Sequence, residues 1–126
     1  MLTGVLTQVA QRTVDLDRAI EFYGGVLGLP LLARFDPPGL AFFDLRGTRL
    51  ILGDGNLSSM LYLAVDDIEA TVSQLRAAGV EVEQDAHLIH TDADGRFGVR
   101  GTEDWMAFIR DSEGNLVGLV ERRPPA

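Results

Sequence analysis

Apolar residues recur at helical spacing in two separate stretches of the chain. The first stretch carries apolar side chains three and four positions apart, at Leu16, Ala19, Ile20, Tyr23 and Leu27. The second stretch repeats this spacing at Ile68, Val72, Leu75 and Ala78. Such spacing places the apolar side chains along one face of a helix, so the pattern predicts two amphipathic helices.

Both predicted helices have recognisable ends. Asp15-Leu16-Asp17 begins the first and Asp66-Asp67 the second, because an aspartate accepts hydrogen bonds from free amides and suits the positive end of a helix. Glycines at positions 24, 25 and 28, followed by Pro30, end the first helix, and Gly79 ends the second.

Short apolar stretches between turn residues predict eight strands. Four lie in the first part of the chain, at Leu6–Val14, Leu31–Phe35, Leu40–Leu45 and Arg49–Leu52. Four lie in the second part, at Met60–Val65, Val80–Glu83, Trp105–Arg110 and Leu116–Val120. The polar segment Asp85–Gly101 interrupts the second set. We expect a long loop there, with a short strand at His87–His90 as the alternative.

The order of elements repeats along the chain. Thr13–Asp17 matches Val65–Glu69 at an offset of 52 residues, and Arg46–Leu50 similarly matches Glu113–Val117. Each half carries one helix and about four strands. Because neither half is expected to bury its apolar face alone, we expect a single domain over residues 1–126, built from modules of about 1–56 and 57–126.

Composition narrows the function classes. The 126 residues carry a net charge of −8 and include no cysteine. A negative field repels a phosphate backbone, which argues against nucleic acid as a partner. Without cysteine there are no disulfides or thiolate zinc sites, which favours a cytoplasmic location. The sequence lacks the pattern of a signal peptide and any apolar run of ~18 residues, so no membrane partner is expected.

Two motifs resemble a known family. Val14–Tyr23 (VDLDRAIEFY), followed by Val26–Pro30 (VLGLP), and Arg110–Leu116 (RDSEGNL) resemble the glyoxalase/bleomycin-resistance/dioxygenase (vicinal oxygen chelate) superfamily. The resemblance covers essentially the whole chain. It implies an α+β fold in which two βαβββ modules form one U-shaped, eight-stranded cup around a ligand, and it implies a homodimer.

In the metal-dependent members of that family, the first and last strands of each module each supply one metal ligand, usually His or Glu. The corresponding positions here are Gln8, Ile51, Met60 and Gly118. Only Gln8 offers an oxygen to a hard cation, and Met60 offers only a soft thioether. The resemblance therefore implies a cup without the usual metal, and a bound divalent metal is the less favoured alternative.

A second candidate metal site lies in the expected long loop. His87 and His90 are the only histidines, and Asp92 and Asp94 follow closely. Imidazole and carboxylate groups together suit zinc. A spacing of three residues brings two ligands together on a helix, however, and this segment does not have a helical pattern. A polar, solvated loop is the favoured interpretation.

Strand alternation predicts which side chains line the cup. The set comprises Gln8, Ala10, Arg12, Arg49, Ile51, Met60, Tyr62, Ala64, Leu116, Gly118 and Val120. A mostly apolar lining with a few polar groups is typical of a small-molecule site. At Gly118 we expect open space where a metal-binding side chain would otherwise stand.

Several candidate ligand-binding residues allow two interpretations. Arg12 and Arg49 either bind a carboxylate or phosphate, or form ion pairs with acids such as Asp44. Tyr62 either donates a hydrogen bond to the ligand or packs at the cup wall. Trp105 either stacks on a planar ligand or, as we favour, belongs to the core or an interface.

Gln11 occupies a position that strand alternation assigns to the core, where an apolar residue is expected. A buried amide needs hydrogen-bond partners. Gln11 therefore indicates a contact at a strand edge or in a dimer, unless the assumed register is one residue off.

The sequence thus predicts a small-molecule-binding protein that lacks the metal ligands of its resembled family. It assigns no catalytic residue. One alternative is a metal-dependent lyase or isomerase of the glyoxalase I or methylmalonyl-CoA-epimerase type, or a dioxygenase-like enzyme. A further alternative is an accessory module that only dimerises or regulates.

Overall fold

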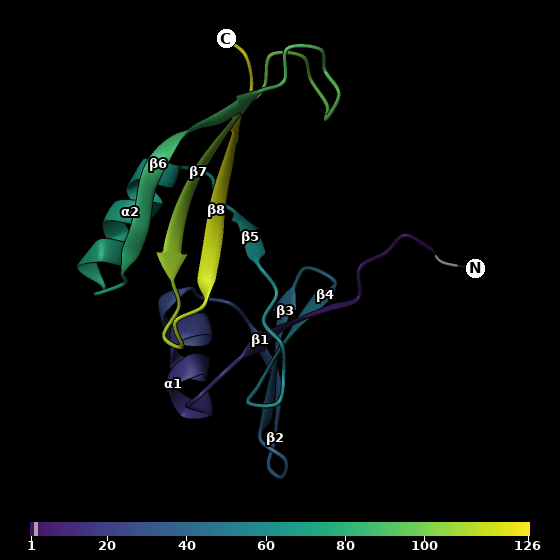
Figure 1. Ribbon diagram of the computed structural model, residues 1–126, viewed down its shortest axis with the longest axis vertical. Helices are drawn as coiled ribbons and strands as arrows, with labels where there is room; N and C mark the ends of the chain where they lie inside the picture. Colours follow the sequence, from purple (N-terminus) through teal and green to yellow (C-terminus); the bar gives the residue numbers. More distant parts are fainter. Residues whose placement is uncertain (2) are drawn as a thin grey trace. The chain divides into compact units, whose positions relative to one another are not determined.

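The chain folds as the order βαβββ, twice (Figure 1). The computed structural model describes Met1 and residues 3–126. The first set comprises β1 (Gln8–Arg12), α1 (Leu16–Ile20), the π-helix η1 (Glu21–Val26), β2 (Leu31–Phe35), β3 (Leu40–Leu45) and β4 (Thr48–Gly53). The second set comprises β5 (Leu61–Ala64), α2 (Ile68–Ala77), β6 (Val82–Thr91), β7 (Glu103–Arg110) and β8 (Leu116–Arg123). The predicted α+β fold with two βαβββ modules is confirmed.

Each set of strands forms its own four-stranded sheet. The orders are β1-β4-β3-β2 and β5-β8-β7-β6. In both sheets the first strand pairs with the last strand of its module in parallel, and the remaining pairs are antiparallel. The chain divides into two compact units: Met1–Ser59 with Asp111–Asn115, and Met60–Arg110 with Leu116–Ala126. We call these the first and second units.

The registers of the two sheets confirm the internal repeat. Val9 pairs with Leu50 in the first sheet, and Leu61 pairs with Val117 in the second. Leu61 lies at the 52-residue offset from Val9, and Val117 stands to Leu50 as Glu113 stands to Arg46 in the repeated turn. The duplication read from the sequence is therefore a duplication of strand pairing as well.

The first unit buries an apolar face of α1 and η1 against its sheet. The Asp15 carboxylate accepts a hydrogen bond from the Arg18 amide and caps the helix, as predicted. The expected single helix is in fact a short α-helix that widens into η1, where the Leu27 amide reaches back to the Phe22 carbonyl. Its core side chains are Ala19, Tyr23, Ala41, Phe43, Leu50 and Leu52.

The second unit has a longer and more regular helix. Asp67 caps α2 by accepting a hydrogen bond from the Ala70 amide, and Gly79 follows the helix with a left-handed φ of 86°. The core consists of Leu61, Ile68, Val72, Leu75, Ala107, Ile109, Val117 and Leu119. Among the described residues, no helix is long and apolar enough to cross a membrane.

The prediction of a long loop at Asp85–Gly101 is wrong for its first part. Residues Val82–Thr91 form β6, an edge strand hydrogen-bonded to β7. An edge strand keeps much of its surface in water, so polar side chains fit there without cost to a core. Three bulges, beginning at Val82, Gln84 and Leu88, also shift the alternation and hide the strand from pattern reading.

Candidate functional site

Each sheet has one face against its helix and a second face pointing away from it. Residues paired across strands project to the same side, so the registers assign the side chains to faces. We call the side of the second sheet that points away from α2 the second open face. Its side chains are Tyr62, Ala64, Gln84, His87, His90, Asp104, Met106, Phe108, Gly118, Val120 and Arg122.

Two aromatic rings cover Gly118 on this face. Tyr62 and Phe108 both pair with Gly118, from strands on either side of it. Their rings pack edge to face, with centroids 6.3 Å apart and an interplanar angle of 80°. A Cβ atom added to Gly118 would lie 2.7 Å from Cδ1 of Tyr62. The expectation of open space at Gly118 is therefore wrong, because the tyrosine ring fills it.

The next row of the second open face is apolar up to the edge strand. Ala64 pairs with Val120, Val120 with Met106, and Met106 with His87. The side chains of Val120, Met106 and His87 are half-buried. Tyr62 is 56% exposed, which leaves its ring accessible at the other edge of the face.

The two histidines lie on strand β6 rather than in a loop. The His87 Nδ1 atom is 2.8 Å from the Asp85 carbonyl, and its Nε2 atom is 3.4 Å from the Gln84 side-chain nitrogen. His90 pairs with Asp104 and packs edge to face against Phe97, with ring centroids 5.7 Å apart. Both imidazoles therefore belong to a sheet, as in the alternative of a short strand at His87–His90 and not as in the favoured loop.

The carboxylate of Asp92 organises the loop that follows β6. It accepts hydrogen bonds from the amides of Arg96 and Phe97, at 2.8 and 3.0 Å. The bond from the Phe97 amide is the main reason that the pKa of Asp92 is lowered, and the amide of Arg96 contributes further. The Asp92 carboxylate thus holds the turn after β6 together, which argues against its joining the histidines as a zinc ligand.

The first open face is the side of the first sheet that points away from α1 and η1. Gln8 pairs with Arg49 there, and Ile51 pairs with Phe42. The Arg49 guanidinium lies 5.9 Å from the centre of the Phe42 ring, within the range of a cation–π contact. Arg49 is also directly opposite Asp44 in the register, the acid named in the ion-pair interpretation.

The other predicted site residues fall at the margins of these faces. Arg12 ends β1 on the first open face, and its amide donates a hydrogen bond to the Ser58 hydroxyl at 3.0 Å. Met60 immediately precedes β5 and is 43% exposed. The structure thus gathers Tyr62, Gly118 and His87 on one sheet face, and Gln8 and Arg49 on another.

Trp105 lies on the opposite side of the second sheet from Tyr62. It pairs with Glu121, and the Arg123 guanidinium stacks 4.2 Å from the centre of its ring. Its indole nitrogen donates a hydrogen bond to Glu103 at 3.0 Å. These contacts place Trp105 on the helix side of the sheet, away from the second open face.

Gln11 is fully buried in the first unit, which supports the assumed register of β1. Its side-chain nitrogen donates to the Tyr23 hydroxyl at 3.4 Å, and that hydroxyl donates to Asp111 at 2.7 Å. Burial, followed by the hydrogen bond to Asp111, raises the pKa of the Tyr23 phenol. The side-chain nitrogen of Gln11 therefore has a partner inside its own unit, and Gln11 lies on β1, an edge strand of its sheet.

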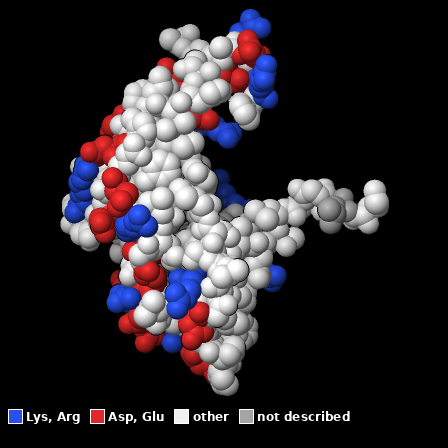
Figure 2. All heavy atoms as spheres, viewed as in Figure 1, with Lys and Arg blue, Asp and Glu red and all other residues white. Residues whose placement is uncertain are grey.

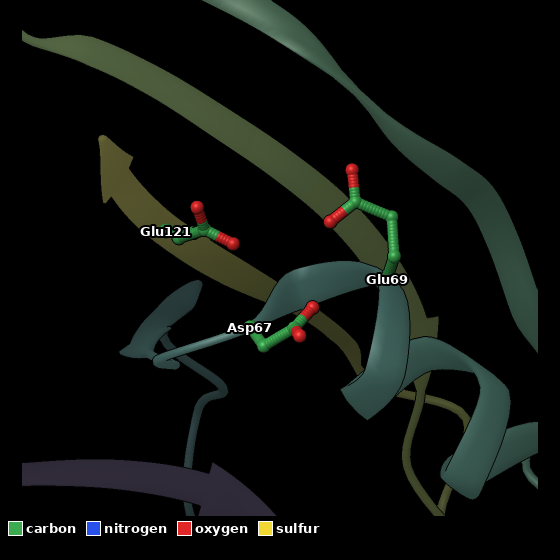
Figure 3. Close-up of side chains that lie close together, drawn as sticks. All are labelled: Asp67, Glu69 and Glu121. Atoms are coloured by element: carbon green, nitrogen blue, oxygen red, sulfur yellow. The ribbon is translucent and has the colours of Figure 1, made fainter. Parts of the chain in front are cut away.

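Three carboxylates lie close enough together to suggest a metal centre (Figure 3). Asp67, Glu69 and Glu121 offer oxygen atoms within 4.8 Å of one another. All three are engaged in other contacts. Asp67 caps α2, Glu121 accepts the Ile68 amide at 2.8 Å, and Glu69 binds Arg123 at 2.6 Å. The three carboxylates hold the start of α2, and Arg123 neutralises part of their charge. We therefore do not propose a metal site there.

Acidic and basic side chains are mixed over the helices on the face shown in Figure 2. A protein that binds a phosphate backbone instead gathers its basic residues into a patch or stripe. On this face the basic side chains do not form such a patch.

A sequence model of one protein family matches nearly the whole chain. The Glyoxalase/Bleomycin resistance protein/Dioxygenase superfamily model covers residues 5–119. The chain belongs to this superfamily. The resemblance read from the helix motif and the closing turn is therefore confirmed.

Superfamily relatives of known name share about a quarter of their residues with the chain. A probable lactoylglutathione lyase of Vibrio cholerae is 28% identical, over 89% of this chain and 86% of the relative. The lactoylglutathione lyase of Haemophilus influenzae is also 28% identical, over 89% of this chain and 88% of the relative.

Solved structures of superfamily members show the same fold. The lactoylglutathione lyase from Agrobacterium tumefaciens superposes with a TM-score of 0.67 at 24% identity, covering 96% of both chains. A superfamily member from Sphaerobacter thermophilus gives a TM-score of 0.73 at 20% identity, covering 96% of this chain and 99% of its own.

Sequence reasoning missed several side chains of the two open faces. Phe42, Met106 and Phe108 lie on these faces, whereas the predicted site residues included none from β3 and only Trp105 from β7, which lies on the other side of the sheet. A signal was present: Ala107 and Ile109 alternate with Met106 and Phe108, so assigning the former pair to the helix side assigns the latter to the open face.

Proposed function

We propose that the protein binds a small, mostly apolar molecule on the open faces of its sheets, and that it does so without a divalent metal. The observation that carries the proposal is the packing of Tyr62 and Phe108 over Gly118. At the position where metal-dependent relatives place a ligand, this protein places two aromatic rings. Aromatic side chains are typical of the lining of small-molecule sites.

The chemistry of the other three positions supports a metal-free site. Ile51 has no donor atom and pairs with the Phe42 ring. Met60 offers a thioether, which is a poor ligand for a hard cation. Gln8 offers one neutral amide oxygen, beside the positive charge of Arg49. This donor set does not fit a divalent metal.

Metal analysis of the purified protein tests the metal-free part of the proposal. We expect less than stoichiometric zinc, nickel or manganese after dialysis against each ion, and no change in melting temperature on adding EDTA. A stoichiometric divalent ion that disappears in Gln8→Ala would overturn it. An ion that is lost in His87→Ala but kept in Gln8→Ala would instead be bound on β6.

Ligand screening tests the binding part. We expect planar apolar compounds to raise the melting temperature, and Phe108→Ala to weaken their binding by about fivefold, since one aromatic contact contributes about 1 kcal/mol beyond buried area. Trp105→Phe is the matched control, because Trp105 lies on the other side of the same sheet. Loss of binding in the control, or no binder among aromatic compounds, would count against the proposal.

A metal-dependent lyase is the competing function, because the relatives of known name are lactoylglutathione lyases. That function needs a metal-binding set that the present residues do not supply. Formation of lactoylglutathione by the purified protein in the presence of added metal would favour it. A homodimer and a cytoplasmic location belong to our proposal, and sedimentation analysis tests the dimer.

A further inference from the structure

The hydrogen bonds of His87 fix which of its ring nitrogens carries the proton. Its Nδ1 atom lies 2.8 Å from the Asp85 carbonyl oxygen. A carbonyl oxygen only accepts hydrogen bonds, so this contact requires a proton on Nδ1. The neutral imidazole then has its lone pair on Nε2. His87 is therefore held as a hydrogen-bond acceptor at Nε2.

The neighbouring amide agrees with this assignment. The Gln84 side-chain nitrogen is 3.4 Å from the Nε2 atom of His87, and an amide nitrogen only donates. At that distance the hydrogen bond is weak, since N–H donors usually approach to about 2.9–3.0 Å. The side chain of Gln84 is exposed, so a stronger donor can displace it from Nε2.

The acceptor lies at the border of an apolar platform. His87 pairs with Met106, and Gln84 pairs with Phe108, so both apolar side chains come from the strand next to β6. Neighbouring strands are about 5 Å apart, which is roughly the width of one aromatic ring. A planar molecule that lies on Met106 and Phe108 therefore brings a ring substituent to the Nε2 atom of His87.

We propose that His87 selects ligands of the second open face by accepting a hydrogen bond at Nε2 from a hydroxyl or N–H group on an aromatic ring. This inference rests on the proposed small-molecule function and names the class of ligand. Phenols and fused aromatic alcohols have the required chemistry: an apolar ring for Met106 and Phe108, and one donor at the ring edge.

The tautomer can be measured without any ligand. Long-range proton–nitrogen NMR of the free protein, at about pH 8.5 where an ordinary histidine is neutral, distinguishes the two ring nitrogens. We expect the Nδ1–H form for His87, with His87→Phe used to assign the signal and His90 as the second signal in the same spectrum. A Nε2–H form at His87 would overturn the inference, while leaving the metal-free binding proposal intact.

A matched pair of probes tests the selection. We would measure binding of 2-naphthol and 2-methoxynaphthalene, which have the same fused ring but differ in the donor. We expect the wild-type protein to prefer the naphthol by about three- to tenfold, the effect of one net hydrogen bond. His87→Phe, which keeps a ring of similar size, removes the preference, and His90→Phe retains it.

The outcomes separate the two proposals. Equal binding of both probes to the wild-type protein, or a preference that survives in His87→Phe, would contradict the role of His87. Neither outcome would contradict the small-molecule proposal. Failure of both probes to bind the wild-type protein would overturn this inference, and with it the small-molecule proposal for aromatic ligands. A Gln84→Ala variant is expected to bind 2-naphthol at least as tightly as wild type, because it removes the competing donor.

Discussion

At matching positions of their open faces, the two sheets carry a large side chain on different strands. In the first sheet one row runs Ala10–Ile51–Phe42, and the matching row of the second runs Tyr62–Gly118–Phe108. Of the first two residues of each row, the larger is Ile51 on the last strand of the first module, and Tyr62 on the first strand of the second module. A duplicated fold can thus keep the volume of a row while changing which strand supplies it.

The cores under these faces differ in polarity. The first unit buries Gln11 beside the Tyr23 hydroxyl, whereas the positions 52 residues later hold Leu63 and Leu75. The polar pair is completed by Asp111, from the segment Asp111–Asn115 that belongs to the first unit. The first unit therefore depends on a buried hydrogen-bond chain where the second relies on apolar packing.

The largest expected effect comes from breaking that chain. Asp111 accepts the Tyr23 hydroxyl, the amides of Glu113 and Asn115, and the Asn115 side chain. We expect Asp111→Ala to lower the free energy of unfolding by about 4 kcal/mol, since it leaves buried donors unsatisfied. Urea denaturation measures the change.

Tyr23→Phe is the matched control, because it removes a single hydroxyl and keeps the ring. We expect about half the loss of Asp111→Ala. If both variants are as stable as the wild-type protein, the buried chain does not stabilise the first unit.

Low pH should weaken the helix start of the first unit. The side chain of Glu113 is fully buried, which disfavours its charge, but hydrogen bonds from Arg18 and from the amides of Asp15 and Val14 prevail and lower its pKa to about 2. Because this pKa lies below the unfolded value of about 4.5, the stabilisation is complete above pH 4.5 and is lost as the pH falls towards 2. Its size is of order 3 kcal/mol.

Glu113→Gln should remove most of that dependence. We expect unfolding free energies measured between pH 6 and 2.5 to fall less steeply in the variant than in the wild-type protein. The corresponding helix start in the second unit uses Glu121, whose pKa is also lowered, first by Arg123 and then by the Ile68 amide. An unchanged slope in Glu113→Gln would assign the acid sensitivity to other carboxylates.

Moving the large side chain from Tyr62 on β5 to Gly118 on β8 tests whether the matching rows of the two sheets are equivalent. We expect Gly118→Ile to destabilise the protein by about 2 kcal/mol, because its Cβ overlaps the Tyr62 ring. The double variant Tyr62→Ala/Gly118→Ile copies the Ala10–Ile51 pair and should recover at least half of the loss. A double-mutant cycle from urea denaturation measures the coupling. Additive effects would mean that the two rows are not equivalent.

Much of the fold was predictable because its signals are local. The aspartate caps, the apolar stripes and the glycine turns each depend on a few consecutive residues, and β2 and β3 were placed with their observed bounds. The strand β6 was not, because bulges break its alternation and an edge strand needs no apolar side chains.

The candidate site was less predictable, because it depends on contacts between distant residues. The absence of metal-type side chains at Ile51 and Gly118 is visible in the sequence. The folding of the Tyr62 ring over Gly118 depends on a register between residues 56 positions apart. The contact of the His87 ring with the Asp85 carbonyl is local in sequence, but it lies beside the register shift between Gln84 and His87, which strand alternation does not reveal. Neither contact has a signature in the local pattern.

The smallest expected effect comes from Trp105→Phe, which tests whether the two sides of the second sheet act independently. Trp105 lies under the Arg123 guanidinium on the helix side. Trp105→Phe keeps a ring there but loses the hydrogen bond to Glu103 and weakens the cation–π contact, so we expect a loss of about 1 kcal/mol in unfolding free energy. Binding of 2-naphthol should be unchanged within twofold. A larger loss of affinity would contradict the assignment of the ligand site to the second open face.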